Sequence, residues 1–220
     1  MLRHRLAAAT ALLLALTACG GGSDDSADDP IAGVDETPSR DEGTASPDED
    51  PTPEPDDQGI PLPDDVELVF DWDTPDDPAE AAALDGAADY LRAIAASVVA
   101  QDPEGGIYRG HAMNQAVDYA RTQVQQWVDG GWTMYGTDRY YNATTSRNSS
   151  NEDMVVVEFC NDSSQLPGKD VETGEVLPAE DQNASSVYHY SVNMAPAPGV
   201  EGFWQAHGVA VEGDAPQCVE

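Results

Sequence analysis

Side chains that could carry out chemistry are few in this chain, and their spacing matches none of the common catalytic or metal-binding patterns. No two histidines lie four residues apart, as zinc ligands on a helix often do, and no two cysteines have metal-binding spacing. The one lysine, Lys169, belongs to no Ser-x-x-Lys pattern, and neither a Gly-x-Ser-x-Gly sequence nor a glycine-rich phosphate loop is present. The sequence therefore predicts no metal site, no cofactor and no serine nucleophile.

The composition is strongly acidic. The 220 residues include 42 Asp and Glu against 9 Lys and Arg, which gives a formal net charge of −33 and an isoelectric point near 4.1. Nucleic acids are excluded as partners, because the chain lacks the basic side chains that would neutralise phosphates. From residue 66 onward there are still 26 acidic and 6 basic residues. A domain with this imbalance repels itself, so we expect salt to stabilise it.

The N-terminal segment is typical of an exported lipoprotein. Arg3 and Arg5 precede an apolar run over residues 6–16, which is too short to cross a membrane core of about 30 Å as a helix. The following sequence Leu-Thr-Ala-Cys-Gly resembles the bacterial lipobox, whose cysteine is lipidated and becomes the new N-terminus. We therefore expect residues 1–18 to be a signal peptide and Cys19 to carry a diacylglyceryl group and a third acyl chain such as palmitate. These chains would hold the protein on the extracytoplasmic face of the cell membrane.

Residues 19–65 are predicted to form a disordered tether. From residue 20 this segment holds 16 acidic residues, 8 prolines and one base, with few large apolar side chains. Such a segment buries too little apolar surface to offset the entropy lost on ordering. The domain is expected to span residues 66–220.

The two remaining cysteines, Cys160 and Cys218, are expected to form a disulfide. Exported chains meet an oxidising environment, and these are the only thiols left in the predicted domain. The bridge would close a long loop and stabilise the domain by on the order of 4 kcal/mol in the chain-entropy model.

Two helices are predicted at the start of the domain. Asp77 caps the first, Pro78 occupies its first position and Glu80 completes a capping box. This helix extends to about residue 100 and places seven apolar side chains on one face: Leu84, Ala87, Ala88, Leu91, Ile94, Ala95 and Val98. The second helix is predicted over residues 112–129, before a pair of glycines.

After the helices the apolar spacing changes from about four residues to two, which predicts strands. Before the helices, a short extended piece is expected at residues 66–72. After them, a small hairpin is expected at residues 169–177. The four main strands are predicted at residues 132–141, 154–160, 186–194 and 203–211. Helices followed by strands indicate an α+β domain with helices on one face of an antiparallel sheet.

The order of these elements resembles a known family. The run Val-Val-Val-Glu-Phe-Cys-Asn-Asp at residues 155–162, the Thr-Gly turn at residues 173–174, and the last strand Phe-Trp-Gln-Ala-His-Gly-Val at residues 203–209 with a terminal Cys carry the likeness. Over about residues 78–219 the chain looks like the small NTF2-like, or SnoaL-like, lipoproteins of high-GC Gram-positive bacteria. The resemblance implies a cystatin-like cone, in which N-terminal helices cover a curved antiparallel sheet of about four to six strands and enclose a pocket. It implies no particular activity, because the fold hosts enzymes and binding modules alike.

In enzymes of this superfamily a pocket Asp, His or Tyr performs acid–base chemistry, which makes Asp162 and His189 the catalytic candidates. Each has a simpler interpretation: Asp162 as a strand-end turn residue and His189 as an outward-facing side chain. The ligand-binding candidates are aromatic, and the same side chains could equally be core: Trp127, Tyr135, Tyr190 and Trp204.

From these features we expect a membrane-anchored, non-enzymatic lipoprotein that binds a small apolar molecule in its cone or a protein partner on its sheet. The alternative is an enzyme of the SnoaL or ketosteroid-isomerase kind. A cavity that converges on a buried carboxylate would favour the alternative, whereas a cone filled by Tyr and Trp side chains would argue against it.

Overall fold

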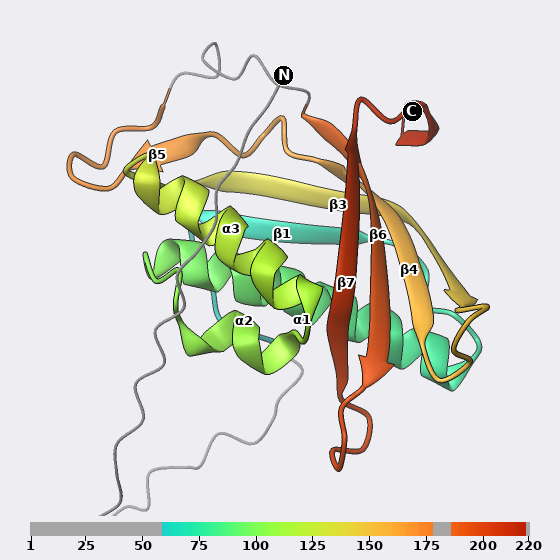
Figure 1. The fold of residues 1–220 in the computed structure, drawn as a ribbon. Coiled ribbons are helices and arrows are strands. Elements are labelled where there is room, and N and C mark those ends of the chain that lie inside the picture. The colour runs from blue at the N-terminus through green and yellow to red at the C-terminus, as the bar shows by residue number, and fades with distance from the viewer. Residues whose placement is uncertain (1–58, 178–185, 219–220) are drawn as a thin grey trace, which may run out of the picture. The chain divides into compact units, whose positions relative to one another are not determined.

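Five strands form the main sheet in the computed structural model, which describes residues 59–177 and 186–218 (Figure 1). The order across the sheet is β1-β3-β4-β6-β7. The strands are β1 (Val66–Asp71), β3 (Gly136–Arg147), β4 (Val155–Asp162), β6 (Val187–Pro196) and β7 (Trp204–Gly213). The expected signal peptide, Cys19 and nearly all of the expected tether lie outside the described residues.

The sheet is mixed, which corrects the expectation of a wholly antiparallel one. Strand β1 pairs with β3 in parallel, and the other neighbours are antiparallel. Parallel pairing is possible here because the three helices and β2 separate β1 from β3 in the chain, which gives the connection the length that a parallel pair requires. Figure 1 shows the sheet twisting so that β1 and β3 run across the direction of β6 and β7.

The strand predicted at residues 132–141 is divided in two. Residues Trp132–Met134 form β2, which pairs with β5 (Gly168–Asp170) in a separate small sheet. The chain then turns at Gly136, whose φ is +97° and where a Cβ atom would collide with the carbonyl oxygen of Gln165. Because only glycine tolerates this backbone geometry and this close approach, Gly136 is where β3 begins.

The first helix is α1 (Pro78–Val99), and all seven apolar side chains predicted to face inward are buried. Asp77 caps it as expected, since its Oδ1 accepts hydrogen bonds from the backbone N–H groups of Ala79 and Glu80. The carboxylate of Glu80 accepts a hydrogen bond of 2.7 Å from the hydroxyl of Thr145. Glu80 therefore ties the start of α1 to β3, whereas the sequence had assigned it to a capping box.

The second predicted helix starts later than expected and is preceded by a short one. Helix α2 (Gly106–His111) was not predicted, and α3 (Gln115–Asp129) begins three residues late. The intervening Ala112 forms a parallel bridge to Ala206, and the N–H of Met113 donates to the carbonyl of Ala206 at 2.7 Å. This extended segment covers part of the outer edge of β7, where backbone groups would otherwise lack partners.

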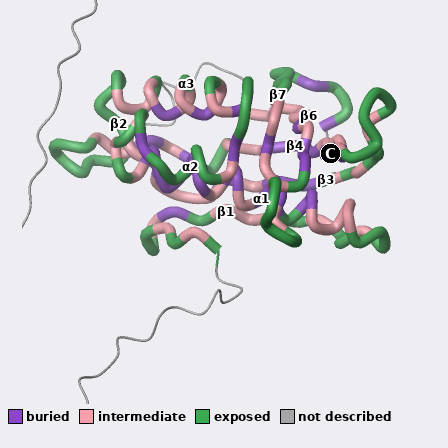
Figure 2. The backbone as a smooth tube through the Cα atoms, turned by 60° about the horizontal axis from the view of Figure 1, so that its bottom comes forward, coloured by how far each residue is buried: buried purple, intermediate pink, exposed green. Residues whose placement is uncertain are grey.

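Helices α1 and α3 pack against the same face of the sheet, and the core lies between these helices and the sheet (Figure 2). Gly86 of α1 lies so close to β7 that an added Cβ would be 2.8 Å from Cβ of Trp204 and 3.1 Å from Cε of Met194. No helix of the described residues is long and apolar enough to cross a membrane.

The opposite face of the sheet carries the disulfide. Cys160 of β4 is joined to Cys218 in the 3-10 helix η2 (Pro216–Cys218), with 5.5 Å between the Cα atoms. The hydroxyl of Tyr141 donates to the carbonyl of Cys218 at 2.6 Å, and these residues form a small buried cluster with Ala215. The bridge thus fastens the end of the described chain to the outer face of the sheet.

Candidate functional site

The strand register brings a row of polar side chains onto the face of the sheet that the helices cover. Tyr140 of β3 lies opposite Asn161 of β4, and Asn161 lies opposite Tyr188 of β6. Because side chains alternate between the two faces of a sheet, Asp138, two residues before Tyr140, points to the same side. Four strand residues that the sequence scatters over 51 positions therefore share one surface.

Asp138 is at the centre of this group and is 5% exposed. Its two carboxylate oxygens accept hydrogen bonds of 2.6 Å, one from the hydroxyl of Tyr140 and one from the side-chain amide of Asn161. Burial raises the pKa of Asp138 to about 6, although both hydrogen bonds oppose the rise, and the nearby charge of Asp162 adds to it. A buried carboxyl with this pKa can hold or release a proton near neutral pH.

Tyrosine side chains surround the carboxyl. The hydroxyl of Tyr119, on α3, donates to the hydroxyl of Tyr190, on β6, at 3.3 Å. Burial raises the pKa of Tyr190 and that of Tyr140 well above the usual value, with a further contribution from the charge of Asp138. The pKa values of Tyr119 and Tyr188 are raised mainly by burial as well, so all four phenols remain neutral at physiological pH.

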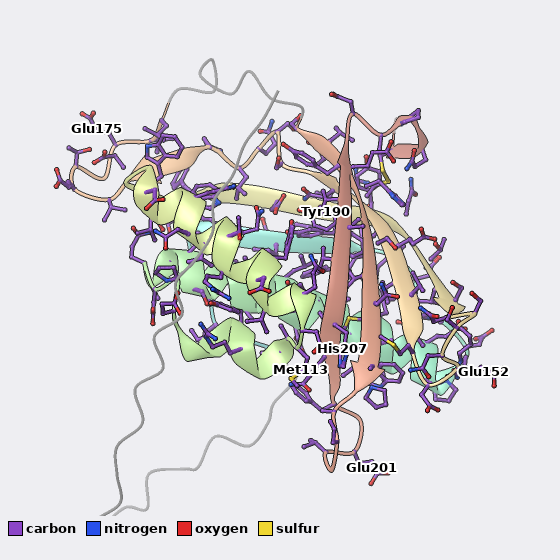
Figure 3. All side chains as sticks on the ribbon, in the orientation of Figure 1. Met113, Glu152, Glu175, Tyr190, Glu201 and His207 are labelled. Carbon is purple, nitrogen blue, oxygen red and sulfur yellow. A yellow bond between two sulfur atoms is a disulfide. The ribbon has the colours of Figure 1, made fainter. Side chains whose placement is uncertain are left out.

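We call the six residues Asp138, Tyr140, Asn161, Tyr119, Tyr188 and Tyr190 the Asp138 cluster. Asp138, Tyr140 and Asn161 are buried, whereas the three other tyrosines keep part of their surface exposed. Figure 3 labels Tyr190 on the sheet, far from the peripheral loops that carry Glu152, Glu175 and Glu201. Solvent thus reaches side chains that interact electrostatically with the central carboxyl.

Apolar aromatic rings extend the cluster. The ring of Phe159 stacks on that of Tyr190 with centroids 5.1 Å apart, and it meets Tyr140 edge-on at 5.8 Å. Tyr140 also stacks on Phe70 of β1 at 5.1 Å, and Phe70 contacts Trp72 at 4.9 Å. This face of the sheet therefore combines aromatic rings with one carboxyl, one amide and several hydroxyls, a composition shared with sites that orient small organic molecules.

The catalytic candidates taken from the sequence lie on the other face of the sheet. Asp162 follows Asn161 and therefore points away from the helices, and its Oδ1 accepts from the backbone N–H of Ser164 at 2.9 Å, as a strand-end turn residue does. His189 pairs with Cys160 and alternates with Tyr188 and Tyr190, so it too points outward. Strand alternation separates both side chains from the Asp138 cluster.

The four aromatic ligand-binding candidates do not form one site. Tyr190 belongs to the Asp138 cluster, whereas Trp204 is buried against Gly86 of α1. Trp127 lies near Gly168 of β5, and the ring of Tyr135 lies 5.6 Å from Nζ of Lys169. Only Tyr190 is therefore placed where a ligand could meet the carboxyl.

The sequence reasoning missed Asp138, Asn161 and Tyr119. One signal for Asp138 was available, because an acid two residues before Tyr140 in an alternating strand must share the face of that tyrosine. Asn161 has the same relationship to Phe159. The contribution of Tyr119 depends on how α3 packs on the sheet, and no local pattern shows it.

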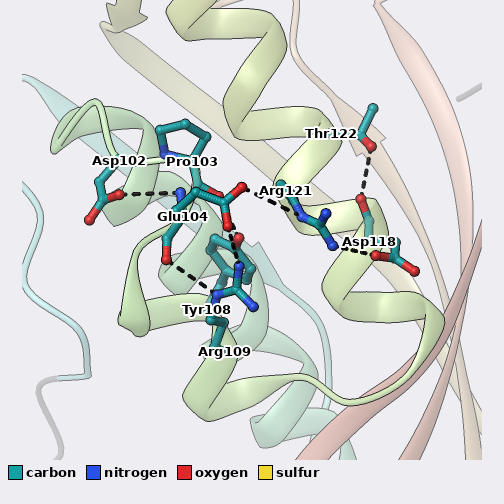
Figure 4. A network of polar contacts seen from close by, with 8 residues as sticks. All are labelled: Asp102, Pro103, Glu104, Tyr108, Arg109, Asp118, Arg121 and Thr122. Carbon is teal, nitrogen blue, oxygen red and sulfur yellow. Dashed lines mark hydrogen bonds and ion pairs between the residues drawn. The ribbon is translucent and has the colours of Figure 1, made fainter. Parts of the chain in front are cut away.

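A second polar network links α2 to α3 but is a poor candidate for a site (Figure 4). Glu104 accepts from Arg109 at 2.7 Å and lies 4.0 Å from Arg121, which also pairs with Asp118. These side chains are exposed and their charges balance, so the network contributes little beyond joining the helices. Within the described part of the chain, no group of three His, Cys, Asp or Glu side chains could hold a metal ion.

No model of a known protein family matches the chain, and neither does any curated protein or solved structure. The fold itself is α+β, with helices packed on a mixed five-stranded sheet. Function is therefore inferred from the Asp138 cluster and from the N-terminal sequence.

Proposed function

We propose that this protein is an exported, lipid-anchored binding protein of the cell surface, whose NTF2-like domain takes up a small organic molecule at the Asp138 cluster without transforming it. The single observation that carries the binding role is the buried carboxyl of Asp138, surrounded by four tyrosines of which three remain partly exposed. Burying a charged carboxylate is unfavourable unless an opposite charge, from the protein or from a ligand, lies against it.

The N-terminal sequence supports the anchored location. The apolar run over residues 6–16 is followed at once by the lipobox-like sequence that ends in Cys19 and Gly20, and then by an acidic, proline-rich segment. In a chain with a formal charge of −33, attachment to an anionic membrane would have to be lipidic. Cys19→Ser should release the protein from the membrane fraction, and its retention there would contradict the anchor.

Two features favour binding over catalysis. The aromatic rings around Asp138 pack face to face and edge to face, which fixes their positions. Both carboxylate oxygens already accept hydrogen bonds from neutral donors, so Asp138 is oriented by its neighbours. A base that abstracts protons from carbon also needs an opposing acid or a hydrogen-bond pair for the oxygen that becomes charged. The partly exposed tyrosines could supply such a hydrogen-bond donor, and for this reason catalysis remains the second proposal.

That second proposal is an enzyme of the SnoaL or ketosteroid-isomerase kind, and it is favoured by the pKa of Asp138, which burial raises to about 6. Asp138 would then be the base, instead of Asp162, which was the carboxylate candidate in the sequence analysis. Turnover of a ketone or enol substrate that is lost in Asp138→Asn would establish this proposal and overturn a purely binding role.

The binding role is tested on the full-length lipidated protein in detergent. A library of small aliphatic and aromatic molecules is screened by the shift in melting temperature. Hits should lose affinity in Asp138→Asn and in Tyr190→Phe but keep it in Glu158→Gln, which removes one carboxylate from β4 on the opposite face. Hits that bind all four proteins equally, or a screen without hits, would contradict the proposed site.

A further inference from the structure

The carboxyl of Asp138 is buried without a cationic partner among the described residues. The groups that stabilise its charged form are the neutral donors Tyr140 and Asn161, and its charged neighbour is another acid, Asp162. The basic side chains of the described ranges form ion pairs with other acids, and Arg139, the nearest in sequence, pairs with Asp71 at 2.8 Å. A buried negative charge without a counter-ion is costly.

The surroundings of Asp138 suit a positive charge. The rings of Tyr190 and Phe159 are stacked, and the rings of Tyr140 and Phe70 are stacked beside them. The faces of phenol and benzene rings attract cations, and this attraction is strongest where water is excluded. The protein already uses this interaction nearby, because the guanidinium of Arg92 lies 4.5 Å from the centroid of Phe70.

The charge of the whole domain acts in the same direction. Residues 66–220 contain 26 acidic and 6 basic side chains. Such a surface attracts small cations and raises their local concentration, whereas it repels anions. A ligand with a positive head and an apolar body would thus be favoured at long range by the domain and at short range by the cluster.

Building on the proposed function, we infer that the ligand of the Asp138 cluster is a small organic cation, an amine or a quaternary ammonium compound. Its charged group neutralises the Asp138 carboxylate, and its apolar groups lie against the rings of Tyr190 and Tyr140. The partly exposed tyrosines, Tyr119, Tyr188 and Tyr190, are the side chains past which it enters.

Two probes of the same shape test the role of charge. Choline carries a quaternary nitrogen, and 3,3-dimethylbutan-1-ol has carbon in its place and is neutral. Binding of each to the full-length protein in detergent is measured by titration calorimetry at pH 7. Choline should bind about tenfold more tightly, as expected for one desolvated cation–π contact together with a carboxylate. Asp138→Asn should remove this preference, and Glu158→Gln should keep it.

A titration of the wild-type protein tests the same inference without a mutation. The groups on the same face as Asp138 are Tyr140, Asn161, Tyr188 and Tyr190 of the sheet and Tyr119 of α3, and the charge of Asp162 acts on it from the opposite face. The four tyrosines stay neutral below pH 8, so Asp138 is the facing group that gains a proton between pH 7 and pH 5. The affinity for choline should fall several-fold over this range, while that for the neutral alcohol stays constant.

The outcomes separate the two levels of the proposal. If the alcohol binds as tightly as choline, or if the preference for choline survives in Asp138→Asn, the cation inference is overturned, and the library screen decides the binding role. If neither probe binds, the cation inference is overturned, and the library screen described above decides the binding role by itself.

Discussion

The hydroxyl of Tyr140 donates a hydrogen bond of 2.6 Å to the carboxylate of Asp138, two residues earlier on the same face of β3. The hydrogen bond from Tyr140 lowers the pKa of Asp138, but burial raises it by more, and the net result is a pKa of about 6. For Tyr140, burial and the charge of Asp138 both raise the pKa. In this pair the hydroxyl of Tyr140 is the donor, and the buried carboxyl of Asp138 can change its protonation state near neutral pH.

Asp138 should make the stability of the domain depend on pH. Its pKa is about 6 in the folded protein and 3.8 in the reference state, so the folded protein binds the proton more tightly. The contribution of Asp138 to the free energy of unfolding is fully present below about pH 4, where the carboxyl is protonated. It falls as the pH rises through 6, by about 3 kcal/mol in total. Asp138→Asn, which cannot ionise, should remove this fall. Urea unfolding of both proteins at pH 4, 5, 6 and 7 measures the difference, and parallel curves for the two proteins would contradict the buried carboxylate.

Gly86→Ala should destabilise the domain even though alanine is the better helix former. The new Cβ would lie 2.8 Å from Cβ of Trp204 and 3.0 Å from its carbonyl oxygen, and these atoms are at or next to the backbone of β7 and cannot move aside easily. We expect a loss of about 1–3 kcal/mol from overpacking, partly offset by about 1 kcal/mol of helix propensity. Gly110→Ala, in α2, is the matched control because its Cβ would meet nothing within 4 Å. Thermal melts that rank the two variants in the opposite order would disprove the close contact.

Loss of the disulfide should weaken the attachment of the C-terminal segment. The double variant Cys160→Ala with Cys218→Ala opens a loop with a sequence separation of 58 residues and should cost on the order of 4 kcal/mol. Tyr141→Phe keeps the bridge but loses the hydrogen bond to the carbonyl of Cys218, so about 1 kcal/mol is expected. Non-reducing peptide mapping of the exported protein checks the linkage directly, and two free thiols there would show that the bridge is not formed.

Salt should raise the melting temperature of the domain. The excess of acidic side chains over residues 66–220 repels itself at low ionic strength, and added ions screen that repulsion. Potassium chloride is the appropriate salt, because sulfate would strengthen apolar burial and confuse the two effects. A melting temperature that does not change between low and molar potassium chloride would refute this expectation.

Helix α1 and the main strands could be predicted because their signals are local. Asp77 and Pro78 mark the start of α1, and the apolar spacing after them identifies its buried face. Helix α2 was missed because its sequence, which includes Gly106 and Gly110, has neither a long apolar repeat nor a capping side chain. The small hairpin with a Thr-Gly turn at residues 173–174 was recognisable, but the pairing of β5, at its base, with β2 was not.

By itself, the sequence determined the acidic character of the protein, the α+β class and the pair of cysteines left to bond with each other, and it predicts an export signal that ends at Cys19. All of these follow from composition or from residues that are close neighbours in the chain. Only the tertiary structure decided that β1 joins the sheet in parallel and that Asp138, Asn161 and Tyr119 meet on one face. The physical reason is that strand register and helix docking depend on contacts between distant segments, and a shift of one residue would send Asp138 to the opposite face of the sheet.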